Sequence, residues 1–349
     1  MTISITDTRQ MPLRGADRPL AELYDAALLD LDGVVYIGRG AVDGAPAALA
    51  AARASGMRVA FVTNNASRTP EEVAAHLREI GVAAEPADVV TSAQAAARLV
   101  AEQVPRGAEV LVVGGEGLDE AVRAHGLRPS RTCGTATAAV VQGFSPDIGW
   151  RLLAEGALAV RRGLPWIVSN VDRTVPTPRG PAPGNGTLVE VIRMATGREP
   201  AAVAGKPQLP LHHEATLRTH AQRPLVVGDR LDTDIECAAR AGSDSLLVLT
   251  GVTTGRQVVL APVEHRPTYL GPNLSALTVA HPAPIEGKDG VWTCGGWTAR
   301  VAGAAVEVRG DGQPYDGLRA LCAAAWSAPG APSGLDADAV DAALDEIGL

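Results

Sequence analysis

Aromatic side chains are scarce in this sequence. Only 3% of the 349 residues are Phe, Trp or Tyr, and the net charge is −8. Proteins that bind nucleic acids commonly stack bases on aromatic rings and present a basic surface, so the two deficits argue against a nucleic-acid partner. Hydrophobic residues still make up 46% of the chain. We therefore expect a large core of alanine, valine and leucine, in a chain long enough for two or three domains.

Long apolar runs and paired cysteines are also absent. No run reaches the length of a membrane span, and the N-terminus lacks the apolar segment of a signal peptide. Polar residues 1–20 are instead predicted to be a loose leader. The four cysteines form no CxxC pair, which argues against zinc. These absences predict no membrane span, reduced thiols and a cytoplasmic location.

Lysine is the third scarce residue. Lys206 and Lys288 are the only lysines among the 31 basic residues, and all others are arginine. The two side chains are not interchangeable at a small charged site, so a lysine in this background deserves notice. Lys206 lies between Gly205 and Pro207, and the proline restricts the backbone of the lysine that precedes it.

Four short apolar segments predict the buried strands of a parallel sheet, because each is rich in leucine or β-branched residues and helical patterns lie between them. They are residues 26–29, 58–62, 224–228 and 245–250. The helices between them include residues 43–55 and 69–80, the latter with Thr69 as N-cap and Pro70 at the first helical position. The predicted fold class is α/β, with a doubly wound, Rossmann-like core.

A second α/β pattern interrupts this core. It predicts further strands at residues 109–113, 138–142 and 166–169, and a helix at residues 150–161. Residues 174–186 are dense in Pro and Gly and are predicted to be the hinge that returns to the core, which resumes with a helix at residues 187–196. We therefore assign residues 20–85 and 184–275 to the core and residues 86–183 to an inserted cap domain.

The composition shifts after about residue 275. Alternating segments at residues 291–293 and 298–302 predict a β-hairpin, and residues 317–327 and 336–347 predict helices. Residues 276–349 are thus expected to form a small α+β appendix. They contain no glycine-rich loop that could hold a phosphate, so we assign them no chemistry.

The first predicted strand runs directly into two carboxylates, Asp30 and Asp32, followed by Gly33. Two like charges at the end of a buried strand repel each other and are costly to remove from water unless a cation lies between them. The pair therefore indicates either a divalent-cation site with a carboxylate nucleophile, or a surface loop that begins with two solvated aspartates.

Two other predicted strands also end in polar residues. Thr63 and Asn64 follow the second strand, and Asp229 follows the third. The carboxyl ends of parallel strands meet at one edge of a sheet, where ligands bind in open α/β folds. A phosphomonoester hydrolase would use such a set of residues. Asp30 would be the nucleophile, and Asp32 would be the general acid and base. Thr63 and Lys206 would bind the phosphate, and Asp229 would bind Mg²⁺ together with Asp30.

These segments resemble the four ordered motifs of the haloacid dehalogenase superfamily. The motifs are Asp30-Leu31-Asp32-Gly33-Val34, Thr63-Asn64, Gly205-Lys206-Pro207 and Gly228-Asp229-x-x-x-x-Asp234. The long insertion is similar to the large cap of the type IIA, nitrophenylphosphatase-like group, and residues 168–186 resemble that group's return to the core. The resemblance covers about residues 20 to 275.

The resemblance assigns further roles. Asp30 would be nucleophile and metal ligand, Asp32 would bind metal through its backbone carbonyl, and Asp234 would be a carboxylate of the Mg²⁺ site or beside it. Candidates for substrate binding are Gly33, Thr63, Asn64, Asn170, Asp172 and Lys206. A strand-end or capping hydroxyl is the alternative for Thr63, and a turn or capping role is the alternative for the three residues Asn64, Asn170 and Asp172.

A cap that closes over the site favours a small phosphorylated metabolite as substrate. The chain with its appendix resembles the glycerol 3-phosphate phosphatases, which implies glycerol 3-phosphate. Phosphoglycolate or another sugar or polyol phosphate is the alternative substrate, and a phosphotransferase or a binding module that senses a phosphorylated ligand are the alternative functions. The resemblance also implies a homodimer formed through the cap.

Overall fold

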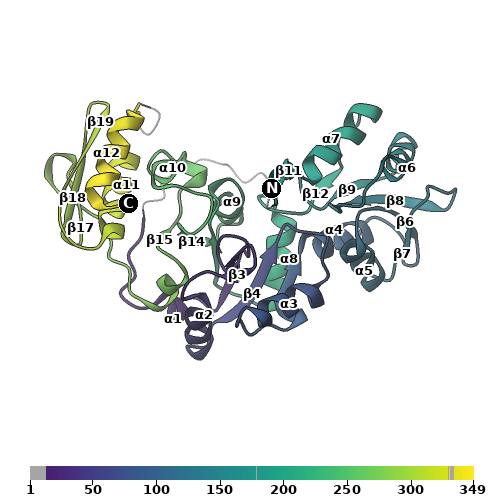
Figure 1. The fold of residues 1–349 in the computed structure, drawn as a ribbon, viewed down its shortest axis with the longest axis horizontal. Coiled ribbons are helices and arrows are strands. Elements are labelled where there is room, and N and C mark those ends of the chain that lie inside the picture. Colours follow the sequence, from purple (N-terminus) through teal and green to yellow (C-terminus); the bar gives the residue numbers. More distant parts are fainter. Residues whose placement is uncertain (1–12, 178, 329, 331–333) are drawn as a thin grey trace, which may run out of the picture. The chain divides into compact units, whose positions relative to one another are not determined.

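Strands and helices alternate along most of the chain, as predicted (Figure 1). The computed structural model describes residues 13–177, 179–328, 330 and 334–349. They form two units, the first made of the described residues within 13–59 and 221–349 and the second of those within 60–220. None of the helices in the described ranges is long and apolar enough to cross a membrane.

A parallel sheet forms the centre of the first unit. The strands of this sheet that belong to the first unit lie in the order β15 (Tyr269–Gly271), β14 (Asp244–Val248), β13 (Pro224–Gly228) and β1 (Ala26–Leu29). Leu29 pairs with Val227 in the parallel register of β1 and β13. The residues that follow these two strands, Asp30 and Gly228-Asp229, therefore emerge side by side.

Short helices and hairpin strands complete the parallel part of the first unit. They are α1 (Leu20–Leu23), β2 (Tyr36–Ile37), β3 (Gly40–Ala41), α2 (Ala45–Ala54), η2 (Leu231–Ile235), α9 (Glu236–Ala241), α10 (Gly255–Val259), η3 (Val263–His265) and η4 (Leu274–Thr278). The predicted leader is wrong for residues 13–20, because Leu13 and Ala16 are buried and the Arg14 N–H donates to the Thr268 carbonyl at 3.0 Å. Residues 1–12 lie outside the described residues.

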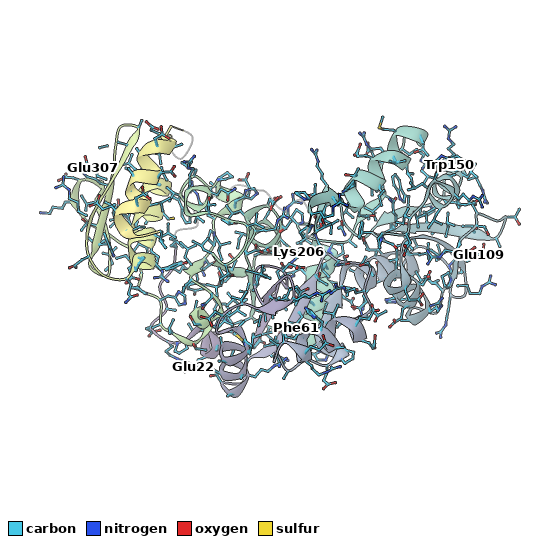
Figure 2. All side chains as sticks on the ribbon, viewed as in Figure 1. Glu22, Phe61, Glu109, Trp150, Lys206 and Glu307 are labelled. Carbon is cyan, nitrogen blue, oxygen red and sulfur yellow. The ribbon has the colours of Figure 1, made fainter. Side chains whose placement is uncertain are left out.

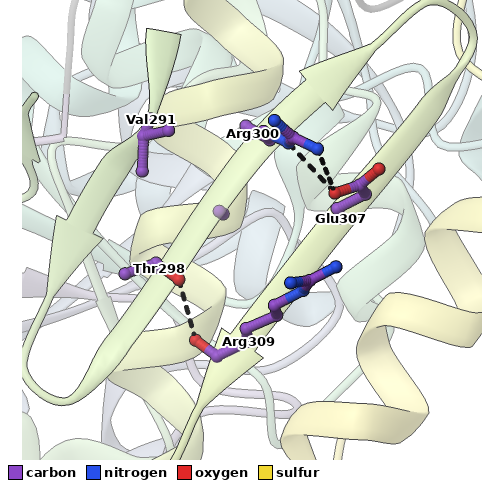
Figure 3. A pocket seen from close by; sticks show the side chains of 6 residues that line it. Val291, Thr298, Arg300, Glu307 and Arg309 are labelled. Atoms are coloured by element: carbon purple, nitrogen blue, oxygen red, sulfur yellow. Dashed lines mark hydrogen bonds and ion pairs between the residues drawn. The ribbon is translucent and has the colours of Figure 1, made fainter. Parts of the chain in front are cut away.

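The carboxyl-terminal appendix contains more sheet than the predicted hairpin. Its antiparallel strands lie in the order β16 (Ile285–Glu286), β17 (Trp292–Cys294), β18 (Trp297–Ala302) and β19 (Ala305–Gly310), with the turn η5 (Lys288–Gly290) between the first two. Helices α11 (Pro314–Ser327) and α12 (Ala337–Ile347) pack on this sheet (Figure 1). A pocket of about 230 Å³ lies on β18 and β19, where Arg300 pairs with Glu307 at 2.8 Å (Figure 3).

The appendix shares a hydrophobic core with the parallel sheet. Leu321 of α11 and Leu344 of α12 belong to the same buried cluster as Leu247 of β14. Arg319, only 7% exposed, donates to the Leu270 carbonyl at 2.6 Å and to His281 Nδ1 at 3.3 Å. Burial lowers the pKa of His281, which favours the neutral ring that can accept this bond. The appendix is therefore an integral part of the first unit.

The second unit contains its own parallel sheet. Its strands lie in the order β12 (Ala202–Val203), β9 (Trp166–Val168), β8 (Thr137–Gln142), β6 (Glu109–Val113) and β7 (Arg128–Ser130). The other elements are β4 (Arg58–Thr63, which begins in the first unit), α3 (Pro70–Glu79), η1 (Pro86–Asp88), β5 (Val89–Thr91), α4 (Ser92–Ala101), α5 (Glu116–Ala124), α6 (Trp150–Arg161), α7 (Asn185–Thr196) and α8 (Leu209–Thr219).

Thr69 caps α3 as predicted, with its hydroxyl accepting from the Glu72 N–H at 3.2 Å. The predicted hinge contains a two-stranded hairpin, β10 (Thr174–Thr177) paired with β11 (Gly180–Pro183). The predicted α/β class, with parallel sheets and flanking helices, is confirmed.

Candidate active site

A cluster of three carboxylates lies in the first unit. Asp30, Asp229 and Asp234 each offer an oxygen atom, and these atoms all lie within 4.8 Å of one another. Asp30 is placed by β1 and β13, because its N–H donates to the Val227 carbonyl at 2.8 Å. Asp229 and Asp234 are each only 1% exposed. The structure thus brings together three of the four predicted metal ligands.

Backbone N–H groups hold two of these carboxylates. Asp229 Oδ2 accepts from the Val252 N–H at 2.7 Å, and Asp234 Oδ2 accepts from the Arg230 N–H at 3.2 Å. Asp234 lies in η2, which is a single π-helical turn. Such turns are rare and occur frequently at functional sites. These hydrogen bonds hold the buried, negatively charged carboxylates of Asp229 and Asp234 close together, an arrangement that suits a small cation bound by oxygen ligands.

Glycines leave the space that the carboxylates occupy. A Cβ atom at Gly33 would lie 2.6 Å from Asp229 Oδ2, and Gly33 has a φ of +82° that favours glycine. A Cβ at Gly251 would overlap Asp229, and one at Gly228 would overlap Asp234. Gly33 was predicted to bind substrate, and the structure places it against a carboxylate of the cluster. The carboxylate cluster fits a magnesium ion because its donors are all oxygen atoms and because the close packing of the glycines holds the carboxylates in place.

Asp32 lies apart from the three clustered carboxylates. Its side chain is exposed, and the Tyr36 hydroxyl donates to Asp32 Oδ2 at a long 3.5 Å. The turn that carries it is closed by the Gly33 N–H, which donates to the Tyr36 carbonyl at 2.8 Å. An exposed carboxylate on an ordered turn can exchange protons with a leaving group or with water, as general acid and base catalysis requires.

Lys206 is buried in the second unit, where it is labelled in Figure 2. Its side chain is only 6% exposed, and its Nζ donates to the Val62 carbonyl at 3.3 Å. Its own N–H donates to Asn64 Oδ1 at 2.8 Å. Thr63 is also buried, and its hydroxyl accepts from the Asn65 N–H at 3.0 Å. The second and third motifs therefore meet within this unit.

The two candidate substrate residues of the cap segment lie beside Asn64. Asn170 Nδ2 donates to the Asn64 carbonyl at 2.7 Å, and the Asp172 carboxylate accepts from Asn64 Nδ2 at 3.2 Å. Sequence reasoning gave no role of its own to Asn185, which is 1% exposed and donates to the Asn170 carbonyl at 2.7 Å. The glycines on either side of it were the available signal. The substrate roles of Asn64, Asn170 and Asp172 stay predictions.

The fold and the carboxylate cluster define the class of the protein, a Rossmann-like α/β enzyme that carries an aspartate pair after its first parallel strand. Two family models match the chain, the haloacid dehalogenase-like hydrolase model over residues 27–128 and the HAD-hydrolase-like model over residues 203–277. The chain belongs to the haloacid dehalogenase-like hydrolase family. A third model, of a GCN5-related N-acetyltransferase like domain, matches residues 294–349 of the appendix.

Named relatives of this chain are phosphatases. It is 47% identical to the D-glycerol 3-phosphate phosphatase of Mycobacterium tuberculosis, covering 89% of this chain and 88% of that protein. It is 38% identical to an acid sugar phosphatase of Staphylococcus aureus, covering 70% and 93%. The predicted enzyme class, a phosphoric monoester hydrolase, is confirmed.

The solved structures that this chain resembles are also phosphatases. The glycerol phosphate phosphatase of M. tuberculosis in complex with magnesium superposes with a TM-score of 0.84 at 46% identity, covering 95% of this chain and 99% of that one. A p-nitrophenyl phosphatase from Archaeoglobus fulgidus gives a TM-score of 0.68 at 29% identity, covering 73% and 98%.

Proposed function

We propose that this chain hydrolyses glycerol 3-phosphate to glycerol and phosphate with Mg²⁺ as cofactor. The observation that carries the proposal is the cluster formed by Asp30, Asp229 and Asp234 at the ends of β1 and β13. The likeness to the mycobacterial D-glycerol 3-phosphate phosphatase supports the choice of substrate. Phosphoglycolate and other sugar or polyol phosphates remain the alternative substrates.

The clustered carboxylates and the backbone carbonyl of Asp32 would hold the ion. Bound Mg²⁺ supplies positive charge that offsets the repulsion between a carboxylate and a phosphate. Two of the carboxylates are almost fully buried, so a cation there also offsets the cost of removing them from water. The set contains oxygen donors alone, which suits Mg²⁺ rather than zinc.

Asp30 is the proposed nucleophile. Its carboxylate oxygen forms a bond to phosphorus while the bond from phosphorus to the glycerol oxygen breaks, and the departing oxygen takes a proton from Asp32. Asp32 then removes a proton from water, which attacks phosphorus and releases phosphate from Asp30. The proposal assigns Thr63 and Lys206 to the oxygens of the same phosphoryl group, where the charge of the transition state develops.

The finer predictions on organisation also remain proposals. We propose a core of residues 20–85 and 184–275 with residues 86–183 as its cap, and a cytoplasmic location. We propose too that the cap forms a homodimer. Trp150 of α6 supports this, because it lies within the proposed cap and is 80% exposed, which is unusual for so large an apolar side chain.

A panel of small phosphoesters tests the function. Purified enzyme with Mg²⁺ is expected to release phosphate with its highest kcat/KM on glycerol 3-phosphate, and chelation by EDTA should abolish the release. No acceptor alcohol is present, so release into water also separates a phosphatase from a phosphotransferase. Failure to release phosphate from any member of the panel would refute catalysis, and a higher kcat/KM on phosphoglycolate or a sugar phosphate would refute the proposed substrate.

Replacing Gly251 by alanine tests the cation site. The new methyl group overlaps the carboxylate of Asp229, so it should displace that ligand and weaken Mg²⁺ binding by about 10–100-fold, the usual cost of disturbing what supports a metal ligand. The measurement is the Mg²⁺ concentration for half-maximal activity, with direct titration by calorimetry. Gly40→Ala is the matched control, because a Cβ there meets nothing within 4 Å. Equal Mg²⁺ affinity in both variants would contradict the site.

A further inference from the structure

We propose that Asn64 is a positioning residue that holds Lys206 in place, and that Asp172 sets the orientation of its amide. The proposal rests on the proposed function, in which Lys206 acts on the phosphoryl group. Asn64 Oδ1 accepts from the Lys206 N–H at 2.8 Å, and Asn64 Nδ2 donates to the Lys206 carbonyl at 3.2 Å. One side-chain amide therefore binds both backbone polar groups of the lysine.

Two partners require the same orientation of this amide. A backbone N–H can only donate, so the oxygen of Asn64 must face Lys206, and an ionised carboxylate can only accept, so the nitrogen must face Asp172. The distance from Asn64 Nδ2 to Asp172 Oδ2 is 3.2 Å. The bond to a carboxylate is charge-assisted and stronger than one between neutral groups. Asp172 therefore prevents the amide from turning over.

Both ends of the lysine are held within the same unit. Asn64 binds its backbone, and the Val62 carbonyl accepts from its Nζ at 3.3 Å. Gly205 allows this approach, because a Cβ atom there would lie 2.5 Å from Asn64 Oδ1. The side chain of Asn64 thus already uses its acceptor and its donors on the protein. This engagement favours a supporting role over direct contact with substrate.

Two more buried asparagines extend the support behind Asn64. Asn185 donates to the Asn170 carbonyl at 2.7 Å, and Asn170 donates to the Asn64 carbonyl at 2.7 Å. A Cβ at Gly184 or Gly186 would overlap the backbone carbonyls of residues 171 and 172, so the start of α7 packs directly on this segment. The chain of amides fixes the Asn64 backbone as well as its side chain. Lys206 consequently has little freedom to move, as a group that acts on the transition state requires.

A double-mutant cycle tests the positioning role. Asn64→Ala is expected to lower kcat on glycerol 3-phosphate by about 10–100-fold, the effect of displacing a catalytic group by about 1 Å, with KM changed by less than about threefold. In the Lys206→Ala background the same change should cost almost nothing further, because the group it positions is gone. If the kcat losses of the two single variants multiply in the double variant, Asn64 acts independently of Lys206. That result, or a rise in KM and in the inhibition constant of inorganic phosphate, would show instead that Asn64 binds substrate.

An exchange of polarity tests the part played by Asp172. Asn64→Asp places a carboxylate against Asp172 and the Lys206 carbonyl, so kcat should fall. Adding Asp172→Asn supplies an amide that can donate to it, so the double variant should regain about tenfold in kcat. Asp172→Asn alone keeps an acceptor for Asn64 and should lose only about threefold. No regain in the double variant would refute the role of Asp172.

Controls separate this proposal from the function on which it rests. Wild-type turnover and its loss in Lys206→Ala test the function alone, whatever Asn64 does. Asn273→Ala removes an amide that caps η4 in the first unit, so it should leave kcat unchanged even where it lowers the melting temperature. Melting curves of all variants identify any that fail to fold. The alanine cycle and the polarity exchange are independent, so either one can overturn the proposal alone.

Discussion

Replacing Asp30 by asparagine should lower kcat by at least about a thousandfold, because a neutral amide oxygen is a poor nucleophile toward phosphorus. The substitution preserves the size of the side chain and the backbone bond from the Asp30 N–H to the Val227 carbonyl. The fold should therefore persist. Steady-state release of phosphate from glycerol 3-phosphate measures the loss, and a melting curve measures the fold.

The covalent step can be observed directly. Wild-type enzyme mixed with radiolabelled substrate and quenched in acid should retain label on the protein, whereas Asp30→Asn should retain none. Asp232→Asn is the matched control, because Asp232 lies near the cluster but is exposed and paired with Arg230 at 2.9 Å. Its kcat should stay within about twofold, as is usual for surface changes. Near-normal turnover in Asp30→Asn would refute the covalent mechanism.

The strands that place the candidate site could be predicted from the sequence because each is a short apolar segment with a polar end. The predicted strands at residues 26–29 and 224–228 match β1 and β13 in both bounds. Because the two strands pair in parallel, Asp30 and Asp229, which follow them directly, must lie close together. Their positions just after the two strands were therefore enough to predict that they share a site. Asp234 could be added only by its motif, because its place in the cluster depends on a π-helical turn that has no simple sequence pattern.

Features that depend on distant contacts could not be predicted. The hairpin of β10 and β11 contains Pro176, Pro181 and Pro183, and prolines normally argue against a strand. A two-stranded hairpin tolerates them because only one side of each strand is paired. The union of the appendix with the parallel sheet depends on Arg319 reaching Leu270, 49 residues away in sequence. Periodicity reports which face of an element is apolar, and it does not report which other element covers that face.

The network around Lys206 shows the same limit at the level of single residues. Asn64, Asn170 and Asp172 could be identified as polar residues near a candidate site, but a sequence cannot show whether such groups face a ligand or one another. The structure shows their hydrogen bonds to each other, with Asn185 behind them. Lys206 itself could be identified because lysine is so rare in this chain.

Replacing Lys206 by arginine should lower kcat by at least about a hundredfold, although the positive charge is retained. Lys206 is only 6% exposed, and its compact ammonium donates to the Val62 carbonyl at 3.3 Å. A planar guanidinium is wider and presents its donors in a fixed fork, so it must displace its neighbours or leave the position of the ammonium empty. The measurement is kcat and KM on glycerol 3-phosphate at saturating Mg²⁺.

The chain offers a matched control for this change. Lys288 is the other lysine and is exposed on the turn η5, where the same substitution should alter neither kcat nor stability by a measurable amount. Lys206→Ala provides the second comparison, because it removes the charge without adding bulk. If the room available around the side chain is decisive, Lys206→Arg should lower kcat nearly as much as Lys206→Ala. Wild-type rates in Lys206→Arg would show instead that charge alone suffices there, and that the fit around the ammonium contributes nothing to catalysis.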